Sequence, residues 1–280
     1  MKRLCLTLLL AFLAVSVFCA EWVPITSEKP EKPRVELISD SVDETTFLVS
    51  IPGFFIEQVK IDEEEYTILK FYEGSNLMEK GCPSLPFLVA NVALKPEGEV
   101  YVKTEEYDTF SIQVEKYLPS KGHFSRNIDP ESVPYTFSEV YEKNAYYPET
   151  TAVAKEPFIL RNVRGTNVQV VPFQYNPQTK EMKINPNILV VVRTEGTGGK
   201  NVLTSQMRVP ESKDFENIYR NEFINYETFS KRYTAISEVG KLLVITYDAF
   251  YDNMMPFVYW KLQKGIPTEI VKLSTIGSTA

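Results

Sequence analysis

Two side chains of this sequence could together perform nucleophilic chemistry, the thiol of Cys82 and the imidazole of His123. A cysteine becomes a nucleophile when a neighbouring base or a helix N-terminus favours its thiolate form. Cys82, however, lies in the segment GCPSLPF, in which Pro83 and Pro86 predict a turn that enters a strand. We therefore favour a small packed cysteine and a loop histidine over a catalytic pair.

Two further patterns resemble ligand sites only superficially. The acidic run Asp62–Glu65 lacks the alternating oxygen ligands and the pivotal glycine of a calcium loop, so we interpret it as the solvated end of a hairpin. Gly196–Gly199 is glycine-rich, but no GK[ST] follows it, and a phosphate-binding loop is not predicted. We predict no metal site and no complete active site within these 280 residues.

The stretch PSKGHFSRNIDP places two cations, Lys121 and Arg126, in an irregular segment from 119 to 157. So long a connection in a compact domain is usually functional or flexible. A cation on such a loop can enter an acidic pocket of a partner, and plain solvent exposure is the alternative. Prolines punctuate the segment at positions 119, 130, 134, 148 and 157.

The segments that must position these loops resemble β-strands. Their short lengths, their β-branched and aromatic residues and the turn residues between them predict an antiparallel sandwich or barrel. Asn176–Lys180 predicts a hairpin turn, residues 212–229 a short surface helix and residues 230–240 a linker. The clearest strand-like segments are RVELIS, TTFLVSIPGFFIEQVKI, YTILKF, PFLVANVAL, EVYVKTEEY, TFSIQVEKYL and the two runs on either side of the hairpin turn.

The segment from 241 onward differs in kind. Leu242–Ile245 is an uninterrupted apolar run, typical of a strand that is covered on both faces. A helix is predicted to begin with Asp252 or Asn253 as its N-cap, to carry Pro256 in its first turn and to stop at Gly265. A second strand around positions 270 and 271 would complete a parallel β–α–β crossover. Such a unit cannot cover its own sheet, so we expect more chain to follow and Leu242–Ile245 to lack neighbours.

Residues 1–20 are predicted to be a secretory signal peptide. A basic pair at positions 2 and 3 precedes an apolar run that ends near Phe18 and is short for a membrane span. Lipid attachment at Cys19 is the alternative, which the bulky Phe18 fits poorly. The mature chain is thus expected to be secreted or held at the cell surface without a transmembrane span, and with Cys82 as its one cysteine it has no internal disulfide.

The charge balance argues against one class of partner. The formal net charge is −7, and no run rich in lysine or arginine occurs beyond the extreme N-terminus. Nucleic acid is therefore not an expected partner.

The segment LLVIT…F…MMPFVYWKLQKGIPTEIV, at 242–271, resembles the opening of the catalytic domain of gingipain-type cysteine proteases. In that family an apolar strand leads into a helix that ends in a W-K-x-Q-[KR]-G-like signature, carried here by Trp260, Lys261, Gln263, Lys264 and Gly265. The preceding region is similar to the gingipain propeptide in three consecutive blocks: GCPSLPFLVANVALKPEG (81–98), SKGHFSRNIDPESVPYTF (120–137) and PFILRNVRGTNVQVVPFQYNPQTKEMKI (157–184).

This resemblance implies the N-terminal portion of a secreted cysteine endopeptidase zymogen. Its expected parts are the signal peptide, a propeptide β-domain at 21–235 with a linker to about 240, and an incomplete caspase-like α/β catalytic domain at 241–280. In the family that domain uses a cysteine and a histidine, often with bound calcium. Both catalytic residues are expected downstream of Ala280, so the sequence itself should be inactive and bind no cofactor.

A folded propeptide that covers the catalytic cleft would keep such an enzyme latent until proteolysis removes it. The expected partners are then its own catalytic domain, by intramolecular inhibition, and peptide or protein substrates of the mature enzyme. The best-known members cleave after arginine or lysine, so Arg126 is the first candidate to occupy the specificity pocket and Lys121 the second. Lys231 and Arg232, in the linker, are the candidate sites of activation cleavage.

A secreted binding or secretion-scaffold protein with a gingipain-like domain is the alternative function. A histidine and a cysteine at successive strand ends beyond position 280 would support the protease, and their loss would favour the scaffold.

Overall fold

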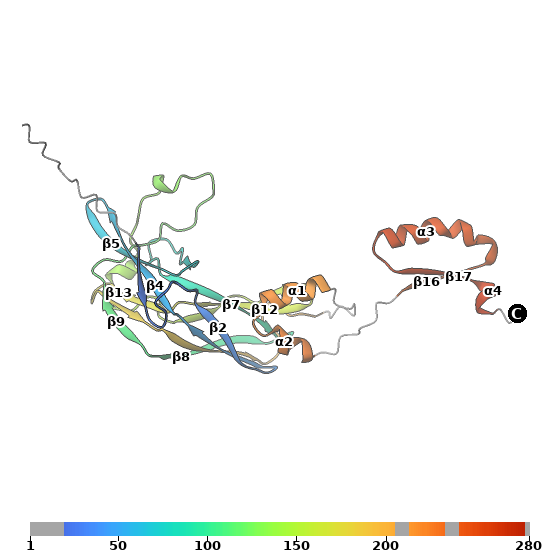
Figure 1. Ribbon diagram of the computed structural model, residues 1–280, viewed down its shortest axis with the longest axis horizontal. Coiled ribbons are helices and arrows are strands. Elements are labelled where there is room, and N and C mark those ends of the chain that lie inside the picture. Colours follow the sequence, from blue (N-terminus) through green and yellow to red (C-terminus); the bar gives the residue numbers. More distant parts are fainter. Residues whose placement is uncertain (1–19, 205–212, 233–240, 278–280) are drawn as a thin grey trace, which may run out of the picture.

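The computed structural model describes residues 20–204, 213–232 and 241–277. Antiparallel sheets form an elongated body, which is followed by two short helices and by a separate β–α–β unit (Figure 1). The predicted mainly β fold, an antiparallel sandwich with a parallel β–α–β unit after it, is therefore confirmed. The domain boundaries at 20, 235 and 240 lie in or beside segments outside the described residues and stay predictions.

One layer of the body is a four-stranded antiparallel sheet in the order β2-β3-β15-β8. Alternate residues of β15 are buried, because successive side chains of a strand point to opposite faces of the sheet. The strands are β2 (Arg34–Asp40), β3 (Glu44–Ser50), β15 (Asn187–Glu195) and β8 (Glu99–Tyr107).

A second sheet faces the first, in the order β10-β12-β7-β6 with β11 also paired to β12. Phe47 and Val190 of the first sheet meet Val92 and Val168 of the second in one fully buried core cluster. The strands are β10 (Ala152–Ala154), β12 (Val163–Val170), β7 (Pro86–Leu94), β6 (Ser75–Asn76) and β11 (Phe158–Leu160).

Two three-stranded sheets, β1-β4-β5 and β13-β14-β9, extend the body around a second core cluster. Phe54 of β4 packs edge-on against Phe173 of β13, with ring centroids 5.3 Å apart. The predicted hairpin at Asn176–Lys180 is confirmed, because β13 and β14 pair from Asn176 and Glu181 onward. The strands are β1 (Glu21–Pro24), β4 (Gly53–Ile61), β5 (Glu64–Lys70), β13 (Phe173–Asn176), β14 (Glu181–Ile184) and β9 (Phe110–Gln113).

The prediction of one surface helix at 212–229 is wrong. The segment forms two helices, α1 (Lys213–Glu222) and α2 (Tyr226–Phe229), and a short 3-10 turn, η3 (Ser230–Arg232), follows directly. The physical reason is its aromatic content, since Tyr219, Phe223, Tyr226 and Phe229 bury their rings in a third core cluster.

The C-terminal unit contains β16 (Leu242–Thr246), η4 (Asp248–Phe250), α3 (Tyr251–Gln263), β17 (Thr268–Lys272) and α4 (Leu273–Ile276). β16 and β17 pair in parallel, as predicted. The predicted start of the helix is wrong: the turn η4 runs directly into α3, so the N-cap is Phe250 and Pro256 lies beyond the first turn. The predicted stop is confirmed, because Gly265 adopts a left-handed backbone conformation with a φ of +73° and donates its N–H to the carbonyl of Leu262.

The apolar strand of this unit is uncovered, as expected. Leu243 and Ile245 are each 53% exposed, and Trp260 and Leu262 of α3 are exposed as well. Among the described residues, no helix is both long enough and apolar enough to span a membrane.

Candidate functional site

The loop at 119–134 is anchored to the body at its base. Ser120 donates its backbone N–H to the carbonyl of Cys82 at 2.8 Å and accepts one from Gly81 at 2.9 Å. Beyond this anchor the chain projects from the sandwich as the green loop that carries η1 (Pro130–Ser132) (Figure 1). The body therefore fixes the base of the loop and leaves its tip accessible.

Lys121 is engaged within the loop itself. Its Nζ donates a hydrogen bond to the carbonyl oxygen of Pro130 at 2.8 Å and lies over the ring of Tyr135, 4.5 Å from the centroid. The cation thus joins the two sides of the loop, and its charge is used by an internal acceptor and an aromatic face.

Arg126 has a different environment at the tip. The turn that carries it is closed by a hydrogen bond from the N–H of Ile128 to the carbonyl of Ser125, at 2.9 Å. Arg126 is exposed, and in the part of the chain that the structure describes its guanidinium has no hydrogen bond, ion pair or aromatic contact. Phe124 and Ile128, two residues to either side, are exposed apolar side chains. The tip therefore presents, between two apolar groups, a cation that has no partner among the described residues.

The role of one residue that shapes this loop, Asp129, was not predicted from the sequence. Asp129 caps η1, because its Oδ1 accepts the N–H of Glu131 at 3.0 Å, and Pro130 occupies the first helical position. An aspartate followed by proline is a recognisable signal for the start of a helix. η1 in turn holds the Pro130 carbonyl at the place where Lys121 donates to it.

The structure does not bring Cys82 and His123 together. Cys82 is buried, and its Sγ lies 3.3 Å from the Oγ of Ser138. His123 is exposed on the loop, and within the described residues no contact joins it to the thiol. The geometry matches the packed cysteine and the loop histidine that the sequence favoured.

The acidic run at 62–65 is the end of the β4–β5 hairpin, as interpreted from the sequence. Asp62 and Glu63 adopt left-handed backbone conformations in the turn, and Glu64 forms an ion pair with Lys116 at 2.7 Å. Among the described residues, no group of three or more His, Cys, Asp or Glu side chains is arranged to hold a metal ion.

A cavity of about 320 Å³ lies beside this hairpin, and its lining includes the tyrosines Tyr66, Tyr117, Tyr141 and Tyr175. Burial, and then the hydrogen bond to Glu64, raises the pKa of Tyr66 to about 12. Burial likewise raises the pKa of Tyr175 to about 12, and its hydroxyl donates to the carbonyl of Val114. At neutral pH these phenols stay protonated and serve as hydrogen-bond donors, so the cavity holds no tyrosinate base.

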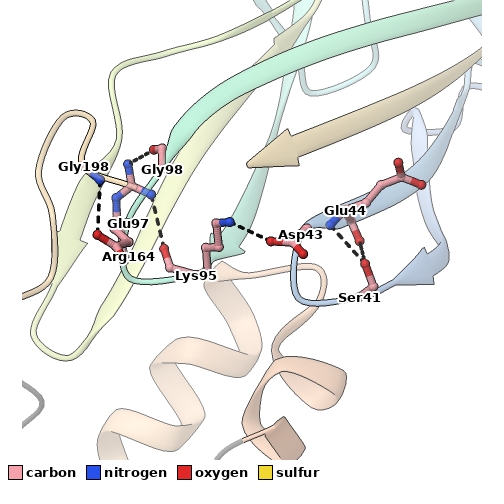
Figure 2. Close-up of polar contacts among 8 residues, drawn as sticks. All are labelled: Ser41, Asp43, Glu44, Lys95, Glu97, Gly98, Arg164 and Gly198. Atoms are coloured by element: carbon pink, nitrogen blue, oxygen red, sulfur yellow. Dashed lines mark hydrogen bonds and ion pairs between the residues drawn. The ribbon is translucent and has the colours of Figure 1, made fainter. Parts of the chain in front are cut away.

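The glycine-rich turn after β15 packs against the loop that precedes β8 and does not enclose a ligand site. Gly198 donates its N–H to the carboxylate of Glu97 at 3.2 Å (Figure 2). Arg164, only 1% exposed, reaches the same region from β12, and its burial lowers the pKa of the guanidinium. It donates to four backbone carbonyls, those of Lys95 at 3.2 Å, Gly98 at 2.9 Å, Lys200 at 2.9 Å and Asn201 at 3.1 Å. No local pattern in the sequence marks this buried arginine.

The candidate cleavage residues lie at the end of the described helical segment. Lys231 is exposed within η3, and Arg232 is the last residue of that turn. The remainder of the predicted linker, 233–240, lies outside the described residues, as do residues 1–19 of the predicted signal peptide.

Comparison with known protein families gives one match over most of the chain. The family model Propeptide_C25 matches residues 26–234. Gingipain R1 of Porphyromonas gingivalis is 33% identical over 257 residues, which is 90% of this chain and 25% of the length of that protein. Lys-gingipain of the same organism is 24% identical over 199 residues, 69% of this chain and 11% of its own length. The chain thus spans about a quarter of the length of Gingipain R1.

Two solved structures share the fold. A complex of the pro- and mature domains of Porphyromonas gingivalis RgpB contains a chain that aligns with a TM-score of 0.63 and 30% identity, over 70% of this chain and 98% of its own. A structure concerned with the zymogenic latency of gingipain K from the same organism aligns with a TM-score of 0.54 and 16% identity, over 64% of this chain, and at that identity it supports the fold alone.

Proposed function

The chain belongs to the Propeptide_C25 family, and from this membership we propose that its β-domain is the inhibitory and folding-assisting propeptide of a secreted cysteine endopeptidase zymogen. In this proposal the β-domain covers the catalytic cleft of its own catalytic domain until proteolysis at Lys231 or Arg232 separates the two. The similarity to a prodomain that was solved together with its mature domain supports an intramolecular partner of this kind.

One observation supports the proposal most strongly, namely the contrast between the two cations of the 119–134 loop. A side chain that fills a partner's specificity pocket must be accessible and free of competing acceptors before the two meet. Arg126 meets both requirements, since it lies exposed at a tight turn with no partner among the described residues. Lys121 already donates to Pro130 and stacks on Tyr135, so it stabilises the loop.

The anchored base makes the loop an efficient inhibitor in physical terms. Because Ser120 and η1 hold the loop in shape before binding, little conformational entropy is lost when the tip enters a cleft. Arginine suits an acidic pocket because its planar guanidinium donates two parallel hydrogen bonds to one carboxylate. The apolar side chains of Phe124 and Ile128 would be buried against the walls of the cleft.

Three parts of the proposal rest on the sequence and the family. The signal peptide at 1–20 predicts export to the cell surface or beyond. Calcium is proposed only for the catalytic domain. Peptides and proteins are the proposed substrates of the mature enzyme.

The proposal is tested by inhibition in trans. Residues 21–235 are mixed with the mature peptidase of the same precursor, and the inhibition constant is measured with a small arginine-containing peptide substrate. We expect tight, reversible inhibition that the same amount of heat-unfolded domain does not produce. If the folded domain leaves the rate unchanged at micromolar concentration, the inhibitory function is wrong and the binding or scaffold alternative gains support.

A further inference from the structure

Asn225 uses its side chain as if it were the backbone of a neighbouring strand. It is fully buried between α1 and α2, and its Oδ1 accepts the N–H of Ala93 at 2.8 Å while its Nδ2 donates to the carbonyl of Ala93 at 3.0 Å. Asparagine at the start of a helix normally caps that helix, but Asn225, the N-cap of α2, makes no such bond. Its amide is committed to β7 instead.

This contact completes a sheet edge. In an antiparallel strand, alternate residues point their N–H and C=O groups to opposite sides. The backbone N–H and C=O groups of the odd-numbered residues of β7 point away from β12. On that side Phe87 pairs with Ser75 of β6. Further along the same edge the carbonyl of Asn91 accepts the N–H of Ile224 at 3.0 Å, and Asn225 then satisfies Ala93. We name residues 213–232 the C-terminal strap.

The same amide also reaches the opposite sheet. Its Nδ2 lies 3.0 Å from Oδ1 of Asp40 and 3.3 Å from Oγ1 of Thr45, at the β2–β3 turn. Thr228, one turn further along the strap, donates to the second carboxylate oxygen of Asp40 at 2.5 Å. The strap is therefore bonded to both layers of the sandwich.

Close packing supports this polar contact. The ring of Phe223 approaches Gly165 of β12 so closely that a Cβ at that position would lie 2.5 Å from a ring carbon. Tyr219, which is fully buried, donates its hydroxyl to the side chain of Asn162 at 2.9 Å. The C-terminal strap thus packs against the body through both α1 and α2. Its last described turn, η3, follows α2 without a break.

We propose that docking of the C-terminal strap through Asn225 holds the backbone at Lys231 and Arg232 in the helical turn η3, which a peptidase cannot bind, so that release of the strap limits how fast the chain is cut there. The proposal rests on the activation cleavage in the proposed function. Peptidases bind their substrates as extended strands, whereas Ser230–Arg232 is helical and follows directly on Phe229, which is buried. Cleavage there requires local opening, and its rate follows the population of the opened state when opening and closing are fast.

The test is limited digestion of the 280-residue chain with added trypsin, followed by mass spectrometry of the cut sites. Asn225→Ala removes the amide, and we expect cleavage after Lys231 or Arg232 to become about tenfold faster, because buried backbone groups of β7 lose their partner. Asn221→Ala is the matched control, since Asn221 lies on the exposed side of α1, and its rate should equal that of the wild type. Cleavage after Arg126, already exposed, should be equal in all forms.

Global unfolding is distinguished by the bond after Arg164, whose side chain is buried. Faster cleavage after Lys231 or Arg232 without faster cleavage after Arg164 supports the proposal. An equal acceleration of cleavage at both places overturns it. Thr228→Val, which loses the hydroxyl bonds to Asp40 and to the carbonyl of Asn225 but keeps the Asn225 amide, gives a milder variant with an expected several-fold acceleration. Unchanged rates in the folded variants would also overturn the proposal. Because trypsin is supplied, none of these outcomes depends on whether the β-domain inhibits a peptidase.

Discussion

The Nζ of Lys121 and the carbonyl oxygen of Pro130 lie 2.8 Å apart across the neck of the 119–134 loop. The bond joins two residues that are nine positions apart in the sequence, and it closes the segment that carries Arg126 at its tip. Lys121 and Arg126 have the same charge and neighbouring positions, yet one stabilises the loop and the other is free to contact a partner.

Lys121→Met tests this division of roles. The substitution keeps most of the aliphatic stem and removes the donor, so the loop loses a hydrogen bond to a charged group and part of its preorganisation. We expect the inhibition constant of residues 21–235 to rise by about five- to tenfold, while the free energy of unfolding stays within about 1 kcal/mol of the wild-type value. Lys103→Met, on the exposed face of β8, is the control. An unchanged inhibition constant for Lys121→Met would show that the neck bond is irrelevant to binding.

Arg164→Lys tests the buried arginine. A lysine cannot donate to the four carbonyls at once, and it leaves acceptors of two loops unsatisfied, so we expect a loss of about 2–4 kcal/mol in the free energy of unfolding. Urea unfolding followed by tryptophan fluorescence measures it. Arg193→Lys, at an exposed ion pair with Glu44, should cost less than about 1 kcal/mol. Equal costs at the two positions would contradict the role assigned to Arg164.

We expect Glu106 to contribute to the free energy of unfolding in a way that depends on pH. Burial alone would raise its pKa, but hydrogen bonds from Thr151 and Thr104 outweigh burial and hold the pKa of the carboxyl below its usual value. A lowered folded pKa stabilises the protein above the unfolded value of about 4.3, and this contribution disappears as the pH falls through the folded pKa. The gap in unfolding free energy between wild type and Glu106→Gln should therefore be about 1 kcal/mol at pH 7 and shrink below pH 4.

The control for that measurement is Glu105→Gln, on the other face of the same strand. Its effect on unfolding should be small at both pH values. A gap for Glu106→Gln that stays constant or widens in acid would mean that the threonine hydroxyls do not stabilise the carboxylate.

The strands were predictable from the sequence because their signals are local. Segments such as EVYVKTEEY show the two-residue alternation of a half-buried strand, and the structure places β8 over the same residues. The hairpin at Asn176–Lys180 was predictable for the same reason, since turn chemistry depends on adjacent residues. The parallel crossover followed from one apolar strand, one helix and a second strand in order.

Contacts between distant segments were not predictable. Arg164 looks like any arginine until the chain brings loops near positions 97 and 200 to its guanidinium. Asn225 looks like a helix cap, and its use on Ala93, 132 positions away, depends on the register of β7. The misplaced start of α3 has a local cause instead, because the turn η4 runs directly into the helix and no side-chain cap at Asp252 is needed.

Of the candidate site, the position of the loop and its two cations could be found from the sequence, but their different roles could not. Choosing between Lys121 and Arg126 required the fold of the loop, in which Asp129 starts η1 and thereby presents the Pro130 carbonyl to Lys121. In the sequence, both residues are simply cations on the same loop.

The central claim is that Arg126 occupies the specificity pocket of the mature peptidase, and the inhibition constant of Arg126→Ala in residues 21–235 tests it most directly. An exposed side chain can be removed with little effect on folding, whereas losing a buried charged anchor from an interface typically costs about 2–4 kcal/mol. We therefore predict inhibition at least thirtyfold weaker than that of the wild type, with an unchanged melting temperature. An inhibition constant within twofold of the wild type would contradict the claim.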